Sequence, residues 1–184
     1  MRLLRYAVAA SLDGYIAGPN GEYDWIPIDP EIDFPAMYAG VGGLVMGRVS
    51  YEVFLATGGA PGSALPTYVY SRTLPEGVRD GVTVVRDAVP HVRTLKAAGD
   101  RKPLWLWGGG TLFRELAAAG LVDVVEVAVL PILLGGGIPL LPSPGPRLAL
   151  RLRAQRVYPT TGTLFLEYDV LNGEESGQRW QIGQ

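Results

Sequence analysis

The chain of 184 residues lacks cysteine altogether and has a single histidine, His91. The missing thiols exclude disulfide bonds, thiolate metal ligands and a cysteine nucleophile, and one histidine excludes a site built from several imidazoles. Lys and Arg form no run and the formal net charge is -2, which argues against a nucleic-acid or anionic-membrane surface. We therefore expect a small-molecule partner, no metal, and chemistry that uses carboxylates, hydroxyls, arginines or a bound cofactor.

A hydrophobic run long enough to cross a membrane is also missing. The most apolar segment, residues 121–141, is interrupted by acidic residues, proline and three glycines. The apolar stretch 6–10 is too short for a signal peptide and runs directly into Asp13 and Gly14, so it is expected to be a first strand. The expected location is the cytoplasm.

What the sequence does contain is an alternation of short β-rich runs with helical patterns, which predicts a mostly parallel sheet covered on both faces. The length favours one domain, over residues 1–171, and residues 172–184 lose all periodicity and are expected to be a mobile tail or an arm that docks on a partner. Consecutive strands near the C-terminus suggest an antiparallel edge. The expected strands are 3–9, 44–46, 67–71, 82–86, 103–107, 124–130, 148–158 and 163–170, and the expected helices are 33–39, 51–56, 89–98 and 111–119.

Three consecutive glycines, residues 108–110, lie where the strand 103–107 gives way to a helix near Thr111. Free backbone N–H groups and the positive end of a helix dipole suit a phosphate, and glycine lets the backbone approach it closely. The pattern G-x-G-x-x-G fails because Phe113 stands where its last glycine belongs, and G-K-[ST] occurs nowhere. The segment therefore predicts a nucleotide site that is neither a standard Rossmann site nor a P-loop.

Two further strand ends carry phosphate-binding chemistry, because a guanidinium and a hydroxyl follow each strand. The carboxyl ends of parallel strands meet at one edge of a sheet, where open α/β sheets bind ligands. Three such ends together would suit a dinucleotide with an extra 2'-phosphate. The residues are Gly47, Arg48 and Ser50 after the strand 44–46, and Ser71 and Arg72 at the end of the strand 67–71.

Five segments in this order and spacing resemble the dihydrofolate reductase-like superfamily: ASLDGYIAG, LVMGRVSYE, VYSRTL, LWLWGGGTLFREL and LPILLGGGIPLL. The likeness covers residues 3–170 and is greatest to the riboflavin-biosynthesis reductase domain, the C-terminal half of a bifunctional deaminase-reductase. It implies an α/β three-layer fold with a central, mixed, mostly parallel sheet of about eight strands flanked by helices. It also implies NADPH as cofactor, hydride transfer to a pyrimidine- or pterin-like substrate, and a homodimer formed through the apolar strand 124–130.

The resemblance also implies roles by position. Ala9, Ile16 and Ala17 would line the nicotinamide, Gly47, Arg48 and Ser50 would hold the pyrophosphate and 2'-phosphate region, Ser71 and Arg72 would bind the 2'-phosphate, and Gly108, Gly109, Gly110, Thr111 and Leu112 would wrap the pyrophosphate. The family often has a cis peptide bond between the first two glycines of that last turn.

Dihydrofolate reductases bind the pterin through an acidic residue on the helix after the first long loop. Counting back from the Gly-Arg pair places Glu31 there, whereas counting forward from Trp25 favours Asp29 or Pro30, so Asp29, Glu31 and Asp33 are all candidates. These acids are equally suited to capping the helix, since Asp and Glu favour first turns. Trp25, which is equally suited to core packing, would complete the substrate pocket together with Phe34.

The substrate that the resemblance favours is 5-amino-6-(5-phosphoribosylamino)uracil, because the helix 33–39 has no basic residue for the glutamate tail of folate. The zinc signature of the deaminase step needs cysteines, which the chain lacks, so only the reductase step is expected. The alternatives are a dihydrofolate or pterin reductase, a stand-alone reductase of another substrate, and a non-catalytic NADP-binding protein.

Overall fold

The computed structural model describes residues 1–60, 65–79, 81–98 and 102–171, and the tail expected at 172–184 lies outside them. Within these residues a nine-stranded sheet runs in the order β10-β11-β8-β1-β7-β3-β4-β6-β5, beside a two-stranded sheet of β2 and β9. The strands are β1 (Leu4–Ser11), β2 (Tyr15–Ala17), β3 (Leu44–Gly47), β4 (Thr67–Tyr70), β5 (Gly77–Arg79), β6 (Val82–Val85), β7 (Leu104–Trp107), β8 (Val124–Leu130), β9 (Ile138–Pro139), β10 (Ala149–Tyr158) and β11 (Thr163–Leu171).

The expected mixed, mostly parallel α/β sheet is confirmed. The six strands from β8 to β6 in the sheet order are parallel, and β11 and β10 add an antiparallel edge next to β8. The sequence patterns missed β2, β5 and β9, which have only two or three residues each. Such short strands carry no periodicity to detect, and β5 pairs antiparallel with β6 at the far edge.

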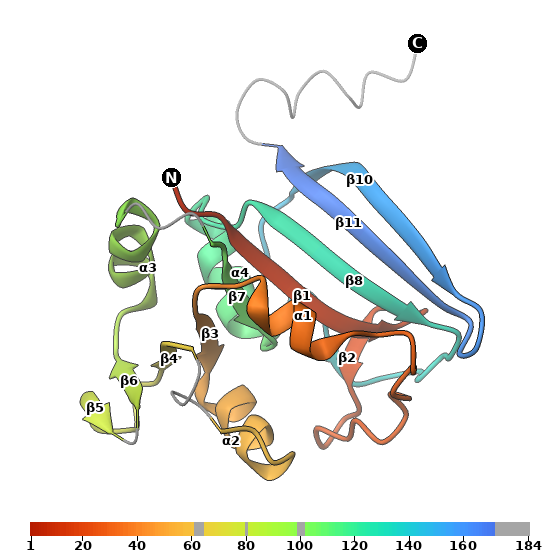
Figure 1. Ribbon diagram of the computed structural model, residues 1–184, viewed down its shortest axis with the longest axis horizontal. Coiled ribbons are helices and arrows are strands. Elements are labelled where there is room, and N and C mark those ends of the chain that lie inside the picture. The colour runs from red at the N-terminus through yellow and green to blue at the C-terminus, as the bar shows by residue number, and fades with distance from the viewer. Residues whose placement is uncertain (61–64, 80, 99–101, 172–184) are drawn as a thin grey trace.

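Helices cover both faces of the central sheet, as the strand-helix alternation predicted. Figure 1 shows α1 in front of the sheet and α4 behind it. On the α4 side, Tyr6 of β1 stacks on Phe113 with ring centroids 3.9 Å apart, and on the other side Met46 and Trp105 pack with Phe54. The helices are α1 (Phe34–Ala39), α2 (Arg48–Ala56), α3 (Ala88–Ala97) and α4 (Gly110–Ala118).

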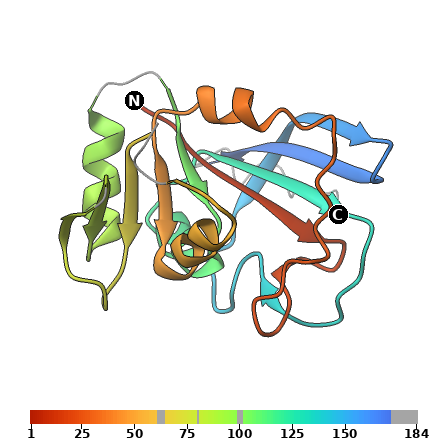
Figure 2. The same ribbon diagram turned by 60° about the horizontal axis from the view of Figure 1, so that its bottom comes forward.

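The antiparallel edge extends past the helices, as Figures 1 and 2 show for β10 and β11. Its two faces differ in chemistry because alternate residues of a strand point to opposite sides. The face that continues the α1 side carries charged residues in ion pairs, such as Arg151 with Asp169 at 3.2 Å. The opposite face carries apolar and aromatic residues of β8 and β11. Val125 is buried, and the half-buried residues are Val127, Val129, Leu164, Leu166, Tyr168 and Val170.

A membrane-spanning helix would need both length and apolar composition. In the part of the chain that the structure describes, none of the helices has the two together.

Candidate active-site cleft

A cleft of about 1900 Å³ opens at the carboxyl ends of the parallel strands and continues over the sheet face that α1 covers. Its strand-end region is formed by residues 47–50, 71–73, 86–88 and 108–115, which follow β3, β4, β6 and β7. Its sheet-face region is formed by one face of β1, β8 and β11 together with residues 23–38. The expected ligand site at the carboxyl edge is therefore a single continuous space with two chemically different parts.

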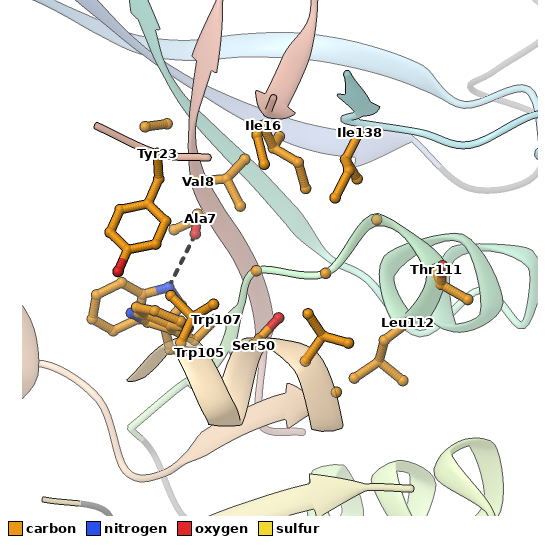
Figure 3. A pocket seen from close by; sticks show the side chains of 18 of the residues that line it. Ala7, Val8, Ile16, Tyr23, Ser50, Trp105, Trp107, Thr111, Leu112 and Ile138 are labelled. Carbon is orange, nitrogen blue, oxygen red and sulfur yellow. Dashed lines mark hydrogen bonds between the residues drawn. The ribbon is translucent and has the colours of Figure 1, made fainter. Parts of the chain in front are cut away.

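The glycine turn between β7 and α4 depends on its glycines. Gly108 and Gly109 have φ of +69° and +85°, a backbone region that strains residues with a side chain. A Cβ at Gly109 would lie 3.1 Å from the Ser50 hydroxyl oxygen, and Figure 3 shows Ser50 beside this turn. A Cβ at Gly110 would lie 2.7 Å from the carbonyl oxygen of Pro139. The turn brings the backbone close to two neighbouring segments and starts α4 at the cleft.

The expectation of a cis peptide bond between Gly108 and Gly109 is wrong. The cis bond in the described chain precedes Pro144, and the turn instead changes direction through the positive φ of its two glycines.

Two of the helices that start at the strand-end region, α2 and α4, begin after a glycine and lack a side-chain cap. α2 and α4 have Gly47 and Gly109 at their N-cap positions, and neither receives a side-chain hydrogen bond there. The first N–H groups of a helix have no partner within the helix and carry its positive dipole end. Two uncapped helix N-termini at one cleft therefore fit the phosphates of a dinucleotide.

Four arginines surround the strand-end region. Arg48 pairs with Glu52 one helical turn later at 2.6 Å, and Arg72 follows β4 on the surface. Arg86 follows β6 and lies 3.6 Å from the Glu76 carboxylate, which also accepts the Arg86 backbone N–H at 2.9 Å. Arg114 lines the same region from α4. The sequence reasoning missed Arg86, although it follows a strand just as Arg48 and Arg72 do.

Every residue predicted to touch the cofactor lines this cleft. Ser71 is buried there, and its hydroxyl accepts the backbone N–H of Leu74 at 2.9 Å, which shapes the turn after β4. The structure therefore brings together what the sequence placed on separate strand ends; the individual roles stay predictions. The residues are Ala9, Ile16, Ala17, Gly47, Arg48, Ser50, Ser71, Arg72, Gly108, Gly109, Gly110, Thr111 and Leu112.

Asp13 joins the two loops that carry Ile16 and Ile138 to the cleft. Its carboxylate accepts a hydrogen bond from Ser11 at 2.6 Å and from the backbone N–H groups of Leu134 and Gly135 at 3.1 and 2.8 Å. These bonds hold the pKa of Asp13 below its usual value, and the bond from Ser11 has the largest effect. The loops are more than a hundred residues apart in sequence, so no local pattern could have shown this link.

Among the three candidate acids, Asp29 is the one that lies in the cleft. It is 1% exposed, and its carboxylate accepts the backbone N–H of Glu31 at 2.9 Å and the hydroxyl of Thr161 at 2.8 Å. Phe34 also lines the cleft, as expected. Asp29 therefore ties the loop before α1 to the turn between β10 and β11 and faces the sheet-face region.

The structure places the other candidates outside the cleft lining. Glu31 is exposed and forms an ion pair with Arg156 of β10 at 3.0 Å. Asp33 caps α1 by accepting the backbone N–H of Ala36 at 2.9 Å, the capping alternative considered from the sequence. Trp25 is half-buried and donates its indole N–H to the carbonyl of Glu22 at 3.1 Å. Hydrogen bonds within the loop and across to β10 thus occupy these side chains.

The sequence reasoning also missed an ion pair between Arg5 of β1 and Glu126 of β8, which both line the sheet-face region. The pKa of Glu126 is raised because burial removes water from its carboxylate, and the hydrogen bond from Arg5 offsets part of this. The signal was present, since each strand carries one charged residue within an apolar run. Only the pairing of the strands shows that the two charges meet.

Aromatic side chains form one wall of the sheet-face region. Trp105 donates its indole N–H to the carbonyl of Ala7 at 3.3 Å, and Tyr38 of α1 lies against it with ring centroids 5.2 Å apart. Tyr23 and Trp107 also line the cleft, and Figure 3 shows their side chains together with that of Trp105. Burial raises the pKa of Tyr38, and a hydrogen bond with Trp107 lowers it in part, so the phenol stays protonated. Such a wall fits a flat ring.

This architecture is that of a dihydrofolate reductase-like domain: a mixed sheet flanked by helices, with a cleft at the carboxyl edge. The family model described as the RibD C-terminal domain matches residues 2–165, and the chain belongs to that family.

The chain is similar to proteins known from sequence and from structure. The uncharacterized protein YyaP of Bacillus subtilis is 28% identical over 88% of this chain and 91% of its own length. A proposed riboflavin biosynthesis protein of Shewanella sp. PV-4, known from its crystal structure, is 30% identical with a TM-score of 0.78, over 94% of this chain and 100% of its own. RibD of Acinetobacter baumannii is 18% identical with a TM-score of 0.72, and the match covers 93% of this chain and 58% of RibD. This last likeness concerns the fold alone.

Proposed function

We propose that this protein is an NADPH-dependent reductase that transfers a hydride to a pyrimidine- or pterin-like heterocycle, the reaction type of the riboflavin-pathway reductase. The observation that carries the proposal is the convergence, on one cleft, of four strand ends, those of β3, β4, β6 and β7, with arginines and uncapped helices. Membership of the RibD C-terminal domain family supports it.

The residues of the cleft fit such a cofactor. The uncapped N-terminus of α4 and the positive-φ glycines would hold the pyrophosphate, and Arg48, Arg72 and Arg86 would bind the 2'-phosphate region. Ala9, Ile16 and Ala17 would contact the nicotinamide, with their loops held by Asp13. NADPH supplies a hydride when bound, and the protein supplies orientation and electrostatics.

Asp29 is the side chain that we assign to orienting the heterocycle. Hydrogen bonds from the backbone N–H of Glu31 and from the hydroxyl of Thr161 fix the carboxylate at the edge of the sheet-face region. A fixed carboxylate there would accept a ring N–H or amine and hold the carbon to be reduced in place. The proton that accompanies the hydride would reach the substrate nitrogen or oxygen from water near this carboxylate.

The experiment has two stages. NADPH and NADH are first added to the purified chain, and thermal unfolding is followed; a ligand that binds the folded state at 100 times its Kd stabilises it by about 2.7 kcal/mol. NADPH oxidation is then measured with a panel that contains 5-amino-6-(5-phosphoribosylamino)uracil, dihydrofolate and dihydropterins. Absence of any NADPH-induced shift would remove the cofactor assignment. A normal shift without turnover of any panel member would favour the non-catalytic NADP-binding protein.

A homodimer through the apolar face of β8 and β11 belongs to the same proposal. This face is half-buried in the single chain, and neighbouring Leu152 and Val157 of β10 are 49% and 61% exposed. All the ion pairs of β10 and β11 lie on the opposite face, so two copies could pack without burying charge. Light scattering with a Leu166→Lys variant tests this, since the lysine would shift a dimer to monomer. A cytoplasmic location likewise stays a prediction.

A further inference from the structure

We propose that the substrate is an electrically neutral, unphosphorylated heterocycle with adjacent carbonyl and N–H groups, recognised by the Arg5–Glu126 pair. This inference rests on the proposed reductase function and narrows its substrate class. The charged residues that line the sheet-face region determine which ligand groups can bind there.

The sheet-face region is poor in positive charge. Among the described residues that line it, Arg5 is the single cation, whereas three carboxylates, Asp24, Asp29 and Glu126, lie around the same space. Glu126 is 4% exposed and contacts the Arg5 guanidinium directly, so the positive charge is compensated within the protein. A phosphate placed here would meet net negative charge, which weakens its binding.

The guanidinium groups on the antiparallel edge near this region are already engaged. Arg153 of β10 pairs with Glu167 at 3.1 Å and does not line the cleft. Arg156 of β10 is held by Glu31 at 3.0 Å and lies over the ring of Tyr158, with 4.5 Å between the guanidinium carbon and the ring centroid. Tyr158 lines the cleft but Arg156 does not. The arginines that line the cleft apart from Arg5 all belong to the strand-end region, so phosphate binding is concentrated there.

The Arg5–Glu126 pair offers a donor and an acceptor side by side. The side chain of Arg5 is 34% exposed and has five N–H donors, of which Glu126 uses part, and the carboxylate of Glu126 keeps acceptor capacity. A lactam or aminopyrimidine edge presents the complementary carbonyl and N–H. A ligand that lacks one of them would leave a donor of Arg5 or an acceptor of Glu126 without a hydrogen bond in the cleft, which costs affinity and gives specificity.

The rim of the sheet-face region is apolar. Tyr23, Ile28, Phe34 and Met37 all line the cleft, and each is exposed to solvent, Ile28 at 80%. Exposed apolar side chains grouped around a cleft are typical of a ligand site. They would contact uncharged substituents on the ring, whereas a phosphoribosyl group would find no charged partner among them.

Paired ligands test the charge prediction. With NADP⁺ bound, calorimetry compares 7,8-dihydroneopterin and 5-amino-6-ribosylaminouracil, each beside its monophosphate. At least one unphosphorylated compound should bind 10-fold or more tightly than its phosphorylated counterpart, on the order of one charge-charge interaction in a partly buried site. The proposal is overturned if the phosphorylated member binds as well or better, or if no member binds. Failure of NADP⁺ itself to bind would instead remove the proposed function.

Matched double variants test the assigned residues. Arg5→Gln with Glu126→Gln removes both charges together, so neither is left buried alone. It should weaken binding of the unphosphorylated ligand by about 10- to 100-fold while NADPH affinity changes less than about two-fold. The control is Arg151→Gln with Asp169→Asn, an ion pair on the same sheet face outside the cleft lining, which should change neither. Equal losses in both double variants would contradict the assignment.

The single variant Glu126→Gln gives a readout that a folding defect does not produce. It removes one negative charge beside Arg5, so the monophosphates should bind more tightly while the neutral ligands bind more weakly. A uniform loss for both kinds of ligand would show that Glu126 is structural and would overturn its role in recognition.

Discussion

In the strand-end region the binding groups are backbone N–H groups, glycines and arginines that follow their strands directly, whereas in the sheet-face region they are side chains of residues far apart in sequence. Gly109 and Gly110 belong to one turn, but Arg5 and Glu126 come from strands separated by 121 positions. The first region is rich in arginine and suits phosphates. In the second region Glu126 compensates the charge of Arg5 and further carboxylates lie nearby, which suits a flat neutral ring. A reductase needs both, because the cofactor carries the phosphates and the substrate must lie beside its nicotinamide.

This difference between backbone and side-chain binding groups also predicts how each region responds to amino-acid substitutions. A backbone site is damaged by any atom that displaces the backbone, whereas a side-chain site is damaged by loss of a partner. The following substitutions separate the two regions, because cofactor affinity and substrate turnover should move independently.

The largest effect is expected for Gly110→Ala. The new methyl group would lie 2.7 Å from the Pro139 carbonyl oxygen, so α4 and β9 must move apart. We expect the free energy of unfolding to fall by about 2 kcal/mol and kcat/KM to fall about 100-fold. Urea unfolding measures the change in the free energy of unfolding, and initial rates over an NADPH titration measure the change in kcat/KM. Gly136→Ala, which meets nothing within 4 Å, is the control; similar losses there would contradict the close-approach argument.

Arg72→Gln tests the positive charge of the strand-end region. Loss of a charge-assisted hydrogen bond to the 2'-phosphate should raise the Kd for NADPH about 10-fold or more, while NADH, which has no such phosphate, binds as before. Titrations with both nucleotides measure the ratio. Arg93→Gln, on the exposed side of α3 and outside the cleft lining, is the control. An equal loss for NADH would mean that Arg72 does not read the 2'-phosphate.

Asp29→Asn tests the sheet-face region alone. The amide keeps the size of the side chain but removes the charge that accepts from Glu31 and Thr161, so unfolding should cost about 1 kcal/mol less and substrate kcat/KM should fall about 10-fold. NADPH affinity should not change. Asp33→Asn is the comparison, since Asn caps a helix as well as Asp does. A turnover loss with Asp33→Asn or Glu31→Gln, but not with Asp29→Asn, would reassign the orienting carboxylate.

Asp13→Asn should have the smallest effect, a loss of NADPH affinity of a few-fold, because the loops of Ile16 and Ile138 lose a shared carboxylate. The native-state pKa of Asp13 is lowered, so its contribution is present above the ordinary pKa of an unfolded Asp and is lost as the pH falls through the lowered pKa. NADPH affinity of the unaltered chain should fall over that acid range, and the Asp13→Asn variant should lack this component. Identical profiles for both chains would contradict the link.

The two regions were also predictable to different degrees. Phosphate chemistry at a strand end is carried by neighbouring residues, so the local pattern alone indicates Gly47, Arg48 and Arg72 as candidates. The sequence alone could not show which of Asp29, Glu31 and Asp33 would face a substrate, because all three lie within five positions on one loop. Their different fates depend on Thr161, Arg156 and the start of α1.

By itself the sequence determined the order of the longer strands and the helices, the antiparallel edge and the strand ends that are candidates for binding phosphate, because periodicity, glycine and helix starts act over a few residues. Only the tertiary structure decided which acid faces the cleft, that Asp13 joins two distant loops, and that Arg5 meets Glu126. These depend on strand order and register, which long-range packing sets. The charge balance of the sheet-face region is therefore a property of the folded sheet.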